Sequence, residues 1–263
     1  MEKSTIIGLI LGVVAVVGGM ILKGAGVGNL INPAAIVIIL VGTVASVSVA
    51  FPMSDLKNVP NLFKIVFSEQ KLPNQVELIE TFKEWASISR REGLLALESK
   101  INEIDDPFLR NGMRLVIDGN EQDFVRDVLM ADISAIEERH KVGALIFSQA
   151  GMYAPTLGVL GAVIGLIAAL SDMSNIDLLA AAIAAAFVAT LLGIFTGYVL
   201  WHPMSNKLRQ LSKKEIAIRH MMIEGVLSIQ SGVSTIGMGQ KLSVFLTPSE
   251  RKALGDEEGM ADA

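Results

Sequence analysis

Four long stretches without a charged residue constrain this chain more than any other feature of its sequence. A helix needs about 20 apolar residues, each adding about 1.5 Å, to cross the hydrocarbon layer of a membrane. The second stretch contains a glycine-rich turn before Asn32 and Pro33, so we place its helix at residues 33–51. The stretches comprise residues 4–22, 24–54, 142–171 and 178–206. The sequence therefore predicts four transmembrane helices.

The first stretch invites comparison with a secretory signal peptide. It is longer than the apolar part of such signals, which spans about 7 to 15 residues. No small-x-small cleavage site precedes a polar mature sequence. We therefore interpret this stretch as a retained helix.

Basic residues are distributed very unevenly around the four stretches. Residues 53–144 contain 12 of the 22 Lys and Arg, and residues 203–263 contain 8 more. With four spans, the N-terminus, the middle segment and the tail share one side of the membrane, which leaves only Lys23 on the other. Because cytoplasmic segments carry the excess of Lys and Arg, we expect both termini in the cytoplasm.

The overall composition excludes several classes of function. The formal net charge is -5, and basic residues are interleaved with acidic ones, so the chain lacks the concentrated positive surface that nucleic acid needs. There is no cysteine, and His140, His202 and His220 are too scattered to form a recognisable metal site. A phosphate-binding glycine loop and a Ser/His/Asp arrangement are also missing. We therefore expect no enzyme, no bound metal and no cofactor.

These features divide the chain into four segments of an all-α membrane protein. Residues 1–52 hold the first pair of transmembrane helices, and residues 145–203 hold the second pair. Residues 53–144 form a helical cytoplasmic domain between spans 2 and 3, because they show no strand-like alternation. Residues 204–263 form a helical cytoplasmic tail with an acidic end.

The first helix of the cytoplasmic domain has a clear start signal. Asn74 and Glu77 have the spacing of a capping box, which predicts a helix from about Gln75. The helical pattern runs on to about residue 101, and Gly93 marks an interruption or a short break in it. Apolar residues that recur at helical spacing are Val76, Ile79, Phe82, Trp85 and Ile88.

Two further helices follow in the same domain. Pro107 after Asp106 predicts the start of a second helix, which we expect to end before Gly119. Asn120 is expected to cap a third helix. No helix-breaking residue separates it from the third transmembrane span. We therefore predict one continuous helix that projects out of the membrane.

The four spans contain no Asp, Glu, Lys or Arg, and only His202, near the end of the last stretch, is titratable. Ion translocation across a membrane generally uses such a side chain, which binds and releases the ion. Polar groups in the spans are hydroxyls and amides, among them Thr43, Ser148, Gln149, Thr156, Thr190 and Thr196. The chain is therefore either a scaffold or the wall around an acid that a second protein provides.

The last two spans have the composition of helix-packing surfaces. Small residues let helix backbones approach closely in a bilayer. Pro155 and Pro203 lie at opposite ends of this pair, and each removes an amide hydrogen bond and can kink a helix. Pro155 also fits a static kink, and Pro203 also fits the start of the cytoplasmic tail. Glycines on these surfaces are Gly158, Gly161 and Gly165 in the third span, and Gly193 and Gly197 in the fourth.

Four motifs give the chain a resemblance to a known family. They are AFVATLLGIF at 186–195 followed after seven residues by Pro203, PTLGVLGAVIGL at 155–166, NPAAIVIILVGT from Asn32, and SRREGLLALE at 89–98. Their order and spacing resemble motility protein A, the MotA/PomA family of flagellar stator subunits in the MotA/TolQ/ExbB proton channel superfamily. The resemblance covers about residues 1–250 and leaves out the acidic tail after Arg251.

This resemblance implies a mechanism and an assembly in the bacterial inner membrane. In the family, a pentamer of A subunits surrounds two copies of motility protein B, whose single membrane helix carries the ion-binding aspartate. Pro155 is similar to the proline that faces this aspartate, and Pro203 to a second proline at the cytoplasmic end of the path. Thr190 resembles the pore threonine. Arg90 and Glu98 resemble the charged pair that contacts the rotor switch protein FliG.

The transported ion is also inferred from the resemblance. Sodium-driven relatives generally have threonine at the position of Ala162, so one oxygen ligand is absent here. A proton needs no cage of oxygen ligands, whereas a partly dehydrated sodium ion does. We therefore expect protons to be the transported ion.

Two alternatives remain open from the sequence. An energiser of the ExbB/TolQ type uses a similar ring around a partner helix, but such proteins usually have three spans and begin outside. The extra N-terminal helix and the SRREGLLALE motif favour the flagellar stator. A self-sufficient channel would need a filter of backbone carbonyls, because the spans contain no charged side chain.

Overall fold

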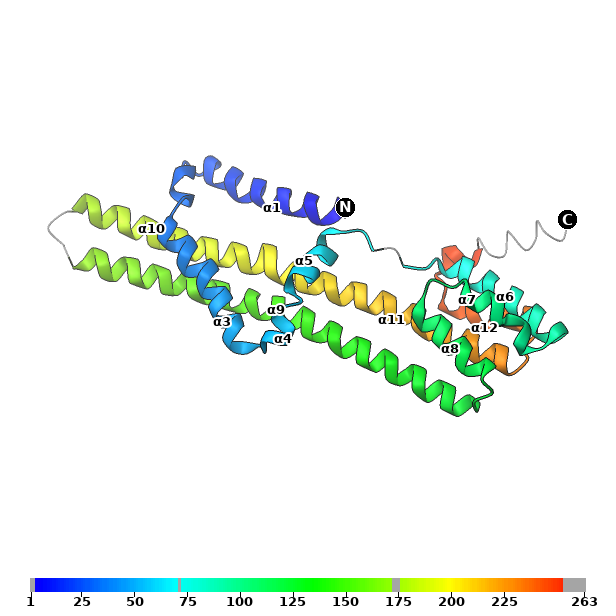
Figure 1. Ribbon diagram of the computed structural model, residues 1–263. Coiled ribbons are helices and arrows are strands. Elements are labelled where there is room, and N and C mark those ends of the chain that lie inside the picture. Colours follow the sequence, from blue (N-terminus) through cyan, green and yellow to red (C-terminus); the bar gives the residue numbers. More distant parts are fainter. Residues whose placement is uncertain (1–2, 71, 172–175, 253–263) are drawn as a thin grey trace. The chain divides into compact units, whose positions relative to one another are not determined.

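The computed structural model describes residues 3–70, 72–171 and 176–252, and helices account for nearly all of them (Figure 1). No strand occurs in these ranges. Four helices are long and apolar enough to cross a membrane. The predicted all-α membrane fold with four transmembrane helices is therefore confirmed. The acidic end of the tail, residues 253–263, lies outside the described residues.

The chain contains two compact units. The membrane unit combines Met1–Gln70 with Arg139–Gln210, and the polar unit combines Lys71–Glu138 with Leu211–Ala263. The boundaries of these units reflect which residues pack together, and they do not show where the chain enters or leaves the membrane. The segment boundaries predicted at residues 53, 145 and 204 therefore stay a prediction.

The first two spans of the membrane unit lie near the N-terminus of the chain. Helix α1 is Lys3–Leu22, and a short 3-10 helix η1, Val27–Leu30, follows it. The second span is built from α2 (Pro33–Ile36), a π-helical turn η2 (Val37–Val41) and α3 (Gly42–Ala50). Its start is fixed by the Asn32 side chain, which accepts a hydrogen bond of 3.1 Å from the Ala35 amide. Proline at the first helical position has no amide that would need a partner there.

The last two spans belong to much longer helices. The third span is the second part of α9, Gln122–Leu170, which contains Pro155. The fourth span is built from α10 (Ile176–Phe195), a π-helical segment η4 (Thr196–Trp201) and the start of α11 (His202–Gln230). The prediction that one continuous helix leads into the third span is confirmed, because α9 has no break.

Two short helices follow the second span within the membrane unit. They are α4 (Met53–Leu56) and α5 (Val59–Phe67). Leu62 and Val66 of α5 are buried against Ala144 and Phe147 of α9. The rings of Phe63 and Phe147 meet edge to face, with centroids 5.0 Å apart. The apolar face of α5 is therefore packed on the third span.

Helices from both halves of the chain build the polar unit. They are α6 (Gln75–Glu92), η3 (Leu94–Leu97), α7 (Glu98–Asn102), α8 (Pro107–Ile117), α12 (Thr235–Leu242), η5 (Ser243–Phe245), the first part of α9 and the second part of α11. Their apolar faces share one core, which includes Phe82, Trp85, Met113, Leu129, Met221 and Leu227. The middle segment and the tail of the chain thus fold together around one apolar core.

Local capping signals decide where the helices of the polar unit begin. The Asn74 side chain accepts from the Val76 amide at 3.0 Å and donates to Glu77 at 3.3 Å, so the predicted capping pair is confirmed. Asp106 accepts from the Leu109 amide at 3.0 Å, which confirms the predicted start of α8 at Pro107. These bonds satisfy amides that have no partner within the helix.

Asn120 has a different role from the one expected. Its side-chain amide donates 2.8 Å to the Leu115 carbonyl, and its own carbonyl accepts from the Gln230 side chain at 2.7 Å. The Val125 amide instead donates to the Glu121 carbonyl, so α9 begins one residue later than predicted. The prediction that Asn120 caps α9 is therefore wrong. The end of α8 has carbonyls without helical partners, and Asn120 satisfies one of them.

Candidate ion-pathway and rotor-contact residues

The third and fourth spans pack backbone against backbone at Gly158 and Gly193. A Cβ atom built on Gly158 would lie 2.9 Å from the Ala189 carbonyl oxygen and 3.0 Å from the Gly193 Cα. A Cβ atom on Gly193 would lie 2.7 Å from the Ala154 carbonyl oxygen. Real Cβ atoms essentially never come so near. The two helices can lie at this separation only because both positions are glycine.

A second close approach lies beside Pro155. A Cβ atom on Gly197 would lie 2.8 Å from both the Gly151 carbonyl oxygen and the Pro155 Cγ. Pro155 has no amide hydrogen, so the Gly151 carbonyl lacks its usual helical donor. There is no room for a side chain between Gly197 and this carbonyl. Pro155 is therefore partly buried at the junction of the two spans.

The remaining predicted packing glycines have looser surroundings. A Cβ atom on Gly161 would be 3.6 Å from the Cβ of Ala189, which is ordinary contact. A Cβ atom on Gly165 would meet none of the described atoms within 4 Å. A packing role of Gly165 would therefore need a neighbouring subunit.

Hydroxyl groups in the spans donate to carbonyls of their own helices. Thr190 donates to the Ala186 carbonyl at 3.3 Å, Thr43 to Ile39 at 2.5 Å, and Thr156 to Met152 at 2.9 Å. A hydroxyl that has given its hydrogen away keeps oxygen lone pairs that accept further bonds. Thr190 can therefore accept from water or another donor without changing its rotamer. Ala162 and Thr190 each follow a contact residue, Gly161 and Ala189, and both are partly buried.

The outer faces of the third and fourth spans are apolar and exposed in the single chain. On α9 they carry Met152, Val159, Leu160, Val163, Ile164 and Ile167, and on α10 they carry Ile183, Phe187 and Ile194. A surface of this kind contacts lipid or the membrane helices of other subunits. Asp, Glu, Lys and Arg are absent from residues 142–171 and 178–206. The two helices therefore form a surface without Asp, Glu, Lys or Arg, whose polar groups are hydroxyls, amides and the His202 imidazole.

The backbone changes from α-helical to π-helical geometry just before Pro203. Segment η4 ends at Trp201, and His202 and Pro203 begin α11. Proline lacks an amide and its ring clashes with the carbonyl four residues earlier, so a locally widened helix accommodates it. Pro203 itself is exposed. The sequence indicated a possible kink at Pro203, but it did not reveal the π-helical segment before it.

His202 is a titratable residue whose surroundings the sequence did not reveal. A Cβ atom built on Gly151 would lie 2.8 Å from its imidazole Cδ2, so a glycine leaves the space that the ring fills. On its other side the Tyr198 ring lies 5.2 Å away, centroid to centroid. One signal in the sequence could have indicated this contact. Gly151 extends the row of small residues on the third span that includes Gly158.

The two residues predicted to contact a rotor lie in the polar unit. Arg90 is in the last turn of α6, and Glu98 is the first residue of α7. Between them Gly93 ends α6 with a φ of 86°, a conformation that side chains rarely adopt. Both charged side chains are exposed, and neither forms an ion pair with any other residue of the described ranges.

Leu95 adds an apolar group to the same surface. It lies in η3, between the two charged residues, and is 71% exposed. Its neighbour Leu97 is fully buried in the core of the polar unit, so the 3-10 turn directs one leucine inwards and the other outwards. A single exposed leucine is common on protein surfaces, so Leu95 by itself does not identify a contact. No pattern in the sequence distinguishes Leu95 from its neighbours.

Two family models match most of the chain. The motility protein A N-terminal model matches residues 6–93, and the MotA/TolQ/ExbB proton channel family model matches residues 100–221. Motility protein A of Bacillus subtilis (strain 168) is 54% identical, with 98% of this chain and 95% of that protein aligned. Chemotaxis protein PomA of Vibrio alginolyticus is 31% identical over 98% of this chain and all of that protein.

Solved structures agree with the sequence relatives. The flagellar MotAB stator complex from Bacillus subtilis contains a chain that matches with a TM-score of 0.91 at 54% identity, covering 96% of this chain and 99% of that one. MotAB of C. jejuni contains a chain that matches with a TM-score of 0.90 at 32% identity, covering 94% and 97%. The chain therefore belongs to the MotA/TolQ/ExbB proton channel family, and within it to the motility protein A subunits of flagellar stators.

Proposed function

We propose that this chain assembles with motility protein B into an ion-conducting stator that exerts torque on the flagellar rotor. The names of its relatives and the two MotAB structures support this assignment. The distribution of Lys and Arg supports a bacterial inner membrane with both termini in the cytoplasm. Its work is ion conduction and force transmission, not covalent catalysis.

The observation that carries the proposal is the uncharged, glycine-packed helix pair. Gly158 and Gly193 hold the third and fourth spans together backbone to backbone. Neither span has a carboxylate that could bind and release an ion. The pair therefore functions as a wall, and the partner subunit brings the aspartate. Pro155 and Pro203 mark the two ends of the proposed path along this wall, and Thr190 provides a hydroxyl between them.

A co-purification experiment tests the assembly. We expect the tagged chain, co-expressed with the motility protein B of the same organism, to retain that partner through gel filtration in detergent. Mass measurement of the intact complex should give a pentamer of this chain around two partner copies. The exposed apolar faces of α9 and α10 support such a ring, because neighbouring subunits and the partner helices would bury them. A chain that purifies alone and conducts ions in liposomes would instead support the self-sufficient channel.

We further propose that the transported ion is the proton. Ala162 has no side-chain oxygen, so one ligand that could replace the water of a sodium ion is absent at this position. Cells that depend on this stator should swim in sodium-free medium and stop when a proton uncoupler is added. Swimming that survives the uncoupler and ends when sodium is withdrawn would establish the opposite coupling.

The exposed pair Arg90 and Glu98 is proposed to contact FliG. Both lie on the surface of the polar unit together with Leu95. Opposite charges on a partner would be recognised at long range, and the leucine would add buried apolar area. Each elementary charge that falls through 100 mV releases about 2.3 kcal/mol, which is the free energy available to move one assembly against the other.

The ExbB/TolQ type of energiser is the second candidate. The proton channel family model includes that type, so its match alone does not decide between the two. The separate match of residues 6–93 to the motility protein A N-terminal model favours the stator. Complementation separates them, because only a stator should restore swimming to cells without their own motility protein A.

A further inference from the structure

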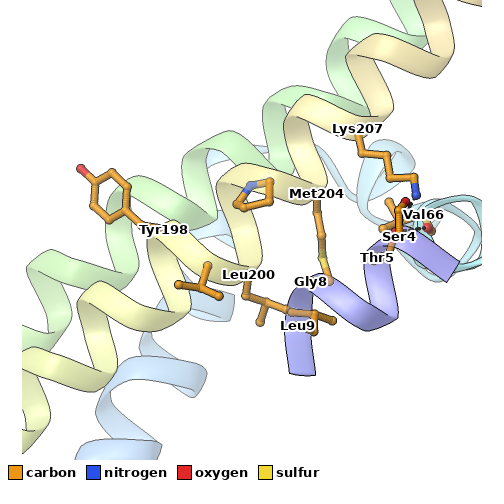
Figure 2. Close-up of a pocket in the computed structure, with 11 residues that line it drawn as sticks. Ser4, Thr5, Gly8, Leu9, Val66, Tyr198, Leu200, Met204 and Lys207 are labelled. Atoms are coloured by element: carbon orange, nitrogen blue, oxygen red, sulfur yellow. Dashed lines mark hydrogen bonds between the residues drawn. The ribbon is translucent and has the colours of Figure 1, made fainter. Parts of the chain in front are cut away.

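A partly open cavity lies between the first and the last span of the membrane unit. Its volume is about 390 Å³, and its walls come from α1, from the end of α5 and from the stretch where η4 passes into α11 (Figure 2). This volume is within the range of about 300–1,000 Å³ that is usual for sites that bind small molecules. The proposed ion path and the rotor contact leave most of this cavity without a role.

One end of the cavity is polar and positively charged. The Lys207 ammonium donates a hydrogen bond of 2.5 Å to the Thr5 hydroxyl, and that hydroxyl donates to the Val66 carbonyl at 3.3 Å. Figure 2 shows Lys207, Ser4, Thr5 and Val66 gathered at this end. Among the described residues that line the cavity, Lys207 is the charged one. An anion is therefore the ligand that this end attracts.

The rest of the cavity is apolar. Leu9, Leu200 and Met204 lie along it, next to Gly8, and Tyr198 lies at the opposite end from Lys207 (Figure 2). A Cβ atom built on Gly8 would meet no described atom within 4 Å, so there is open space beside this glycine on the α1 wall of the cavity. The cavity thus joins an anion-attracting end to an apolar channel between two helices.

The position of the cavity along the spans defines its environment. Thr5 lies in the first turn of α1, and Lys207 is the first charged residue after the uncharged stretch 178–206. The polar end therefore lies where two spans leave the hydrocarbon, on the side with most Lys and Arg. Phosphate groups of lipids are found at this depth, with their acyl chains directed into the bilayer.

We propose that this cavity binds one anionic phospholipid, with its phosphate at the Lys207 ammonium and an acyl chain along Leu9, Leu200 and Met204. A lipid matches both ends of the cavity at once, whereas a free phosphate matches only the polar end. Seated there, the lipid fills the space between α1 and α11 and steadies α1 against the rest of the membrane unit.

Native mass spectrometry of the complete complex with motility protein B tests the headgroup. The complex is incubated with phosphatidylglycerol or with phosphatidylcholine, and the retained lipid is counted per A subunit. We expect one phosphatidylglycerol per A subunit, in preference to phosphatidylcholine. Lys207→Gln should lower this preference about fivefold, the effect of one basic residue at an anionic surface. Lys207→Arg should keep it, and Arg209→Gln, which removes a charge outside the cavity, should leave it unchanged.

A second pair of variants tests the acyl channel. Gly8→Leu places a side chain into the cavity where a Cβ atom meets nothing, so the helix should tolerate it while lipid occupancy falls. Gly19→Leu is the matched control, because Gly19 lies on the same helix, is also without neighbours within 4 Å and does not line the cavity. Its lipid occupancy should equal that of the unaltered complex.

Several outcomes would overturn the proposal. Equal retention of the two lipids, or an unchanged preference in Lys207→Gln, would show that the polar end selects no lipid phosphate. Displacement of the lipid by excess inorganic phosphate would assign the site to the free anion. A photo-crosslinker at Gly8 that captures a second copy of this chain in place of lipid would show that a neighbouring subunit fills the cavity.

Discussion

Gly158 and Gly193 bring two membrane helices into contact through their backbones: a Cβ atom on Gly193 would lie 2.9 Å from the Gly158 Cα. Dispersion between closely packed backbones, and not hydrophobic burial, holds helices together inside a bilayer. The contact lies one turn beyond Pro155 in α9, so the geometry of the proposed ion path depends on it.

Gly193→Ala should destabilise the protein. The new methyl group would lie 2.7 Å from the Ala154 carbonyl oxygen, and a backbone atom cannot turn aside as a side chain can. Overpacking of this kind costs about 1–3 kcal/mol. We expect a lower Tm of the purified complex and reduced swimming. Gly165→Ala is the control, because its methyl group would meet no described atom within 4 Å; an equal loss in both variants would contradict the packing argument.

Thr190→Val should slow ion flow without loss of assembly. Valine has the shape of threonine but no oxygen, so a water or ion at this level loses one acceptor. A hydrogen bond of about 1 kcal/mol corresponds to about a fivefold change in rate. Thr190→Ser should retain most of the flux, because the hydroxyl remains. Proton flux into vesicles and swimming speed measure the effect; an equal flux in the valine and serine variants would show that the hydroxyl is not used.

Charge reversal at Arg90 and Glu98 should reduce torque and leave the complex intact. Both side chains are exposed, so reversal should cost little stability. Swimming speed and co-purification with motility protein B measure the two effects separately. Arg126→Glu is the control, since it reverses an exposed charge of the polar unit away from this surface. Normal swimming of the double reversal would refute a rotor contact through these residues.

The end of the described tail should respond to acid through Glu250. Hydrogen bonds from the Thr247 hydroxyl, and then from the Thr247 amide, hold the pKa of the Glu250 carboxyl below its ordinary value. A carboxyl with a lowered pKa stabilises the fold above its unfolded pKa, and this contribution is lost as the pH falls through its folded pKa. Thr247→Val should therefore raise the pKa of Glu250, which an NMR titration measures. Ser249→Ala keeps both bonds and should leave the pKa unchanged.

Local signals were sufficient for the spans and for most helix ends. Uncharged stretches predicted the four membrane helices, because hydrocarbon excludes charges whatever the rest of the fold is. Capping pairs such as Asn74 with Glu77 act within one turn, so they are visible in the sequence. Asn120 shows the limit of such signals. A side chain between two helices can cap the end of the first or the start of the second. Asn120 caps the end of α8, and its carbonyl accepts from Gln230, which lies far along the chain.

The candidate site was only partly visible in the sequence. Glycines on the third and fourth spans could be named, but the sequence did not distinguish Gly158, which has no room for a methyl group, from Gly165, which has ample room. That difference depends on the crossing point of two helices. The same holds for Leu95, which becomes exposed because a 3-10 turn buries Leu97 instead.

Hydrophobicity, charge and capping along the sequence determined the class of this protein, its four spans and the absence of a carboxylate within them. Tertiary structure alone decided that Gly158 meets Gly193, that His202 fills the space beside Gly151, and that Lys207 reaches Thr5 across the membrane unit. The reason is physical. Burial in a membrane depends on each segment by itself, whereas close packing and cavities depend on where separate helices cross.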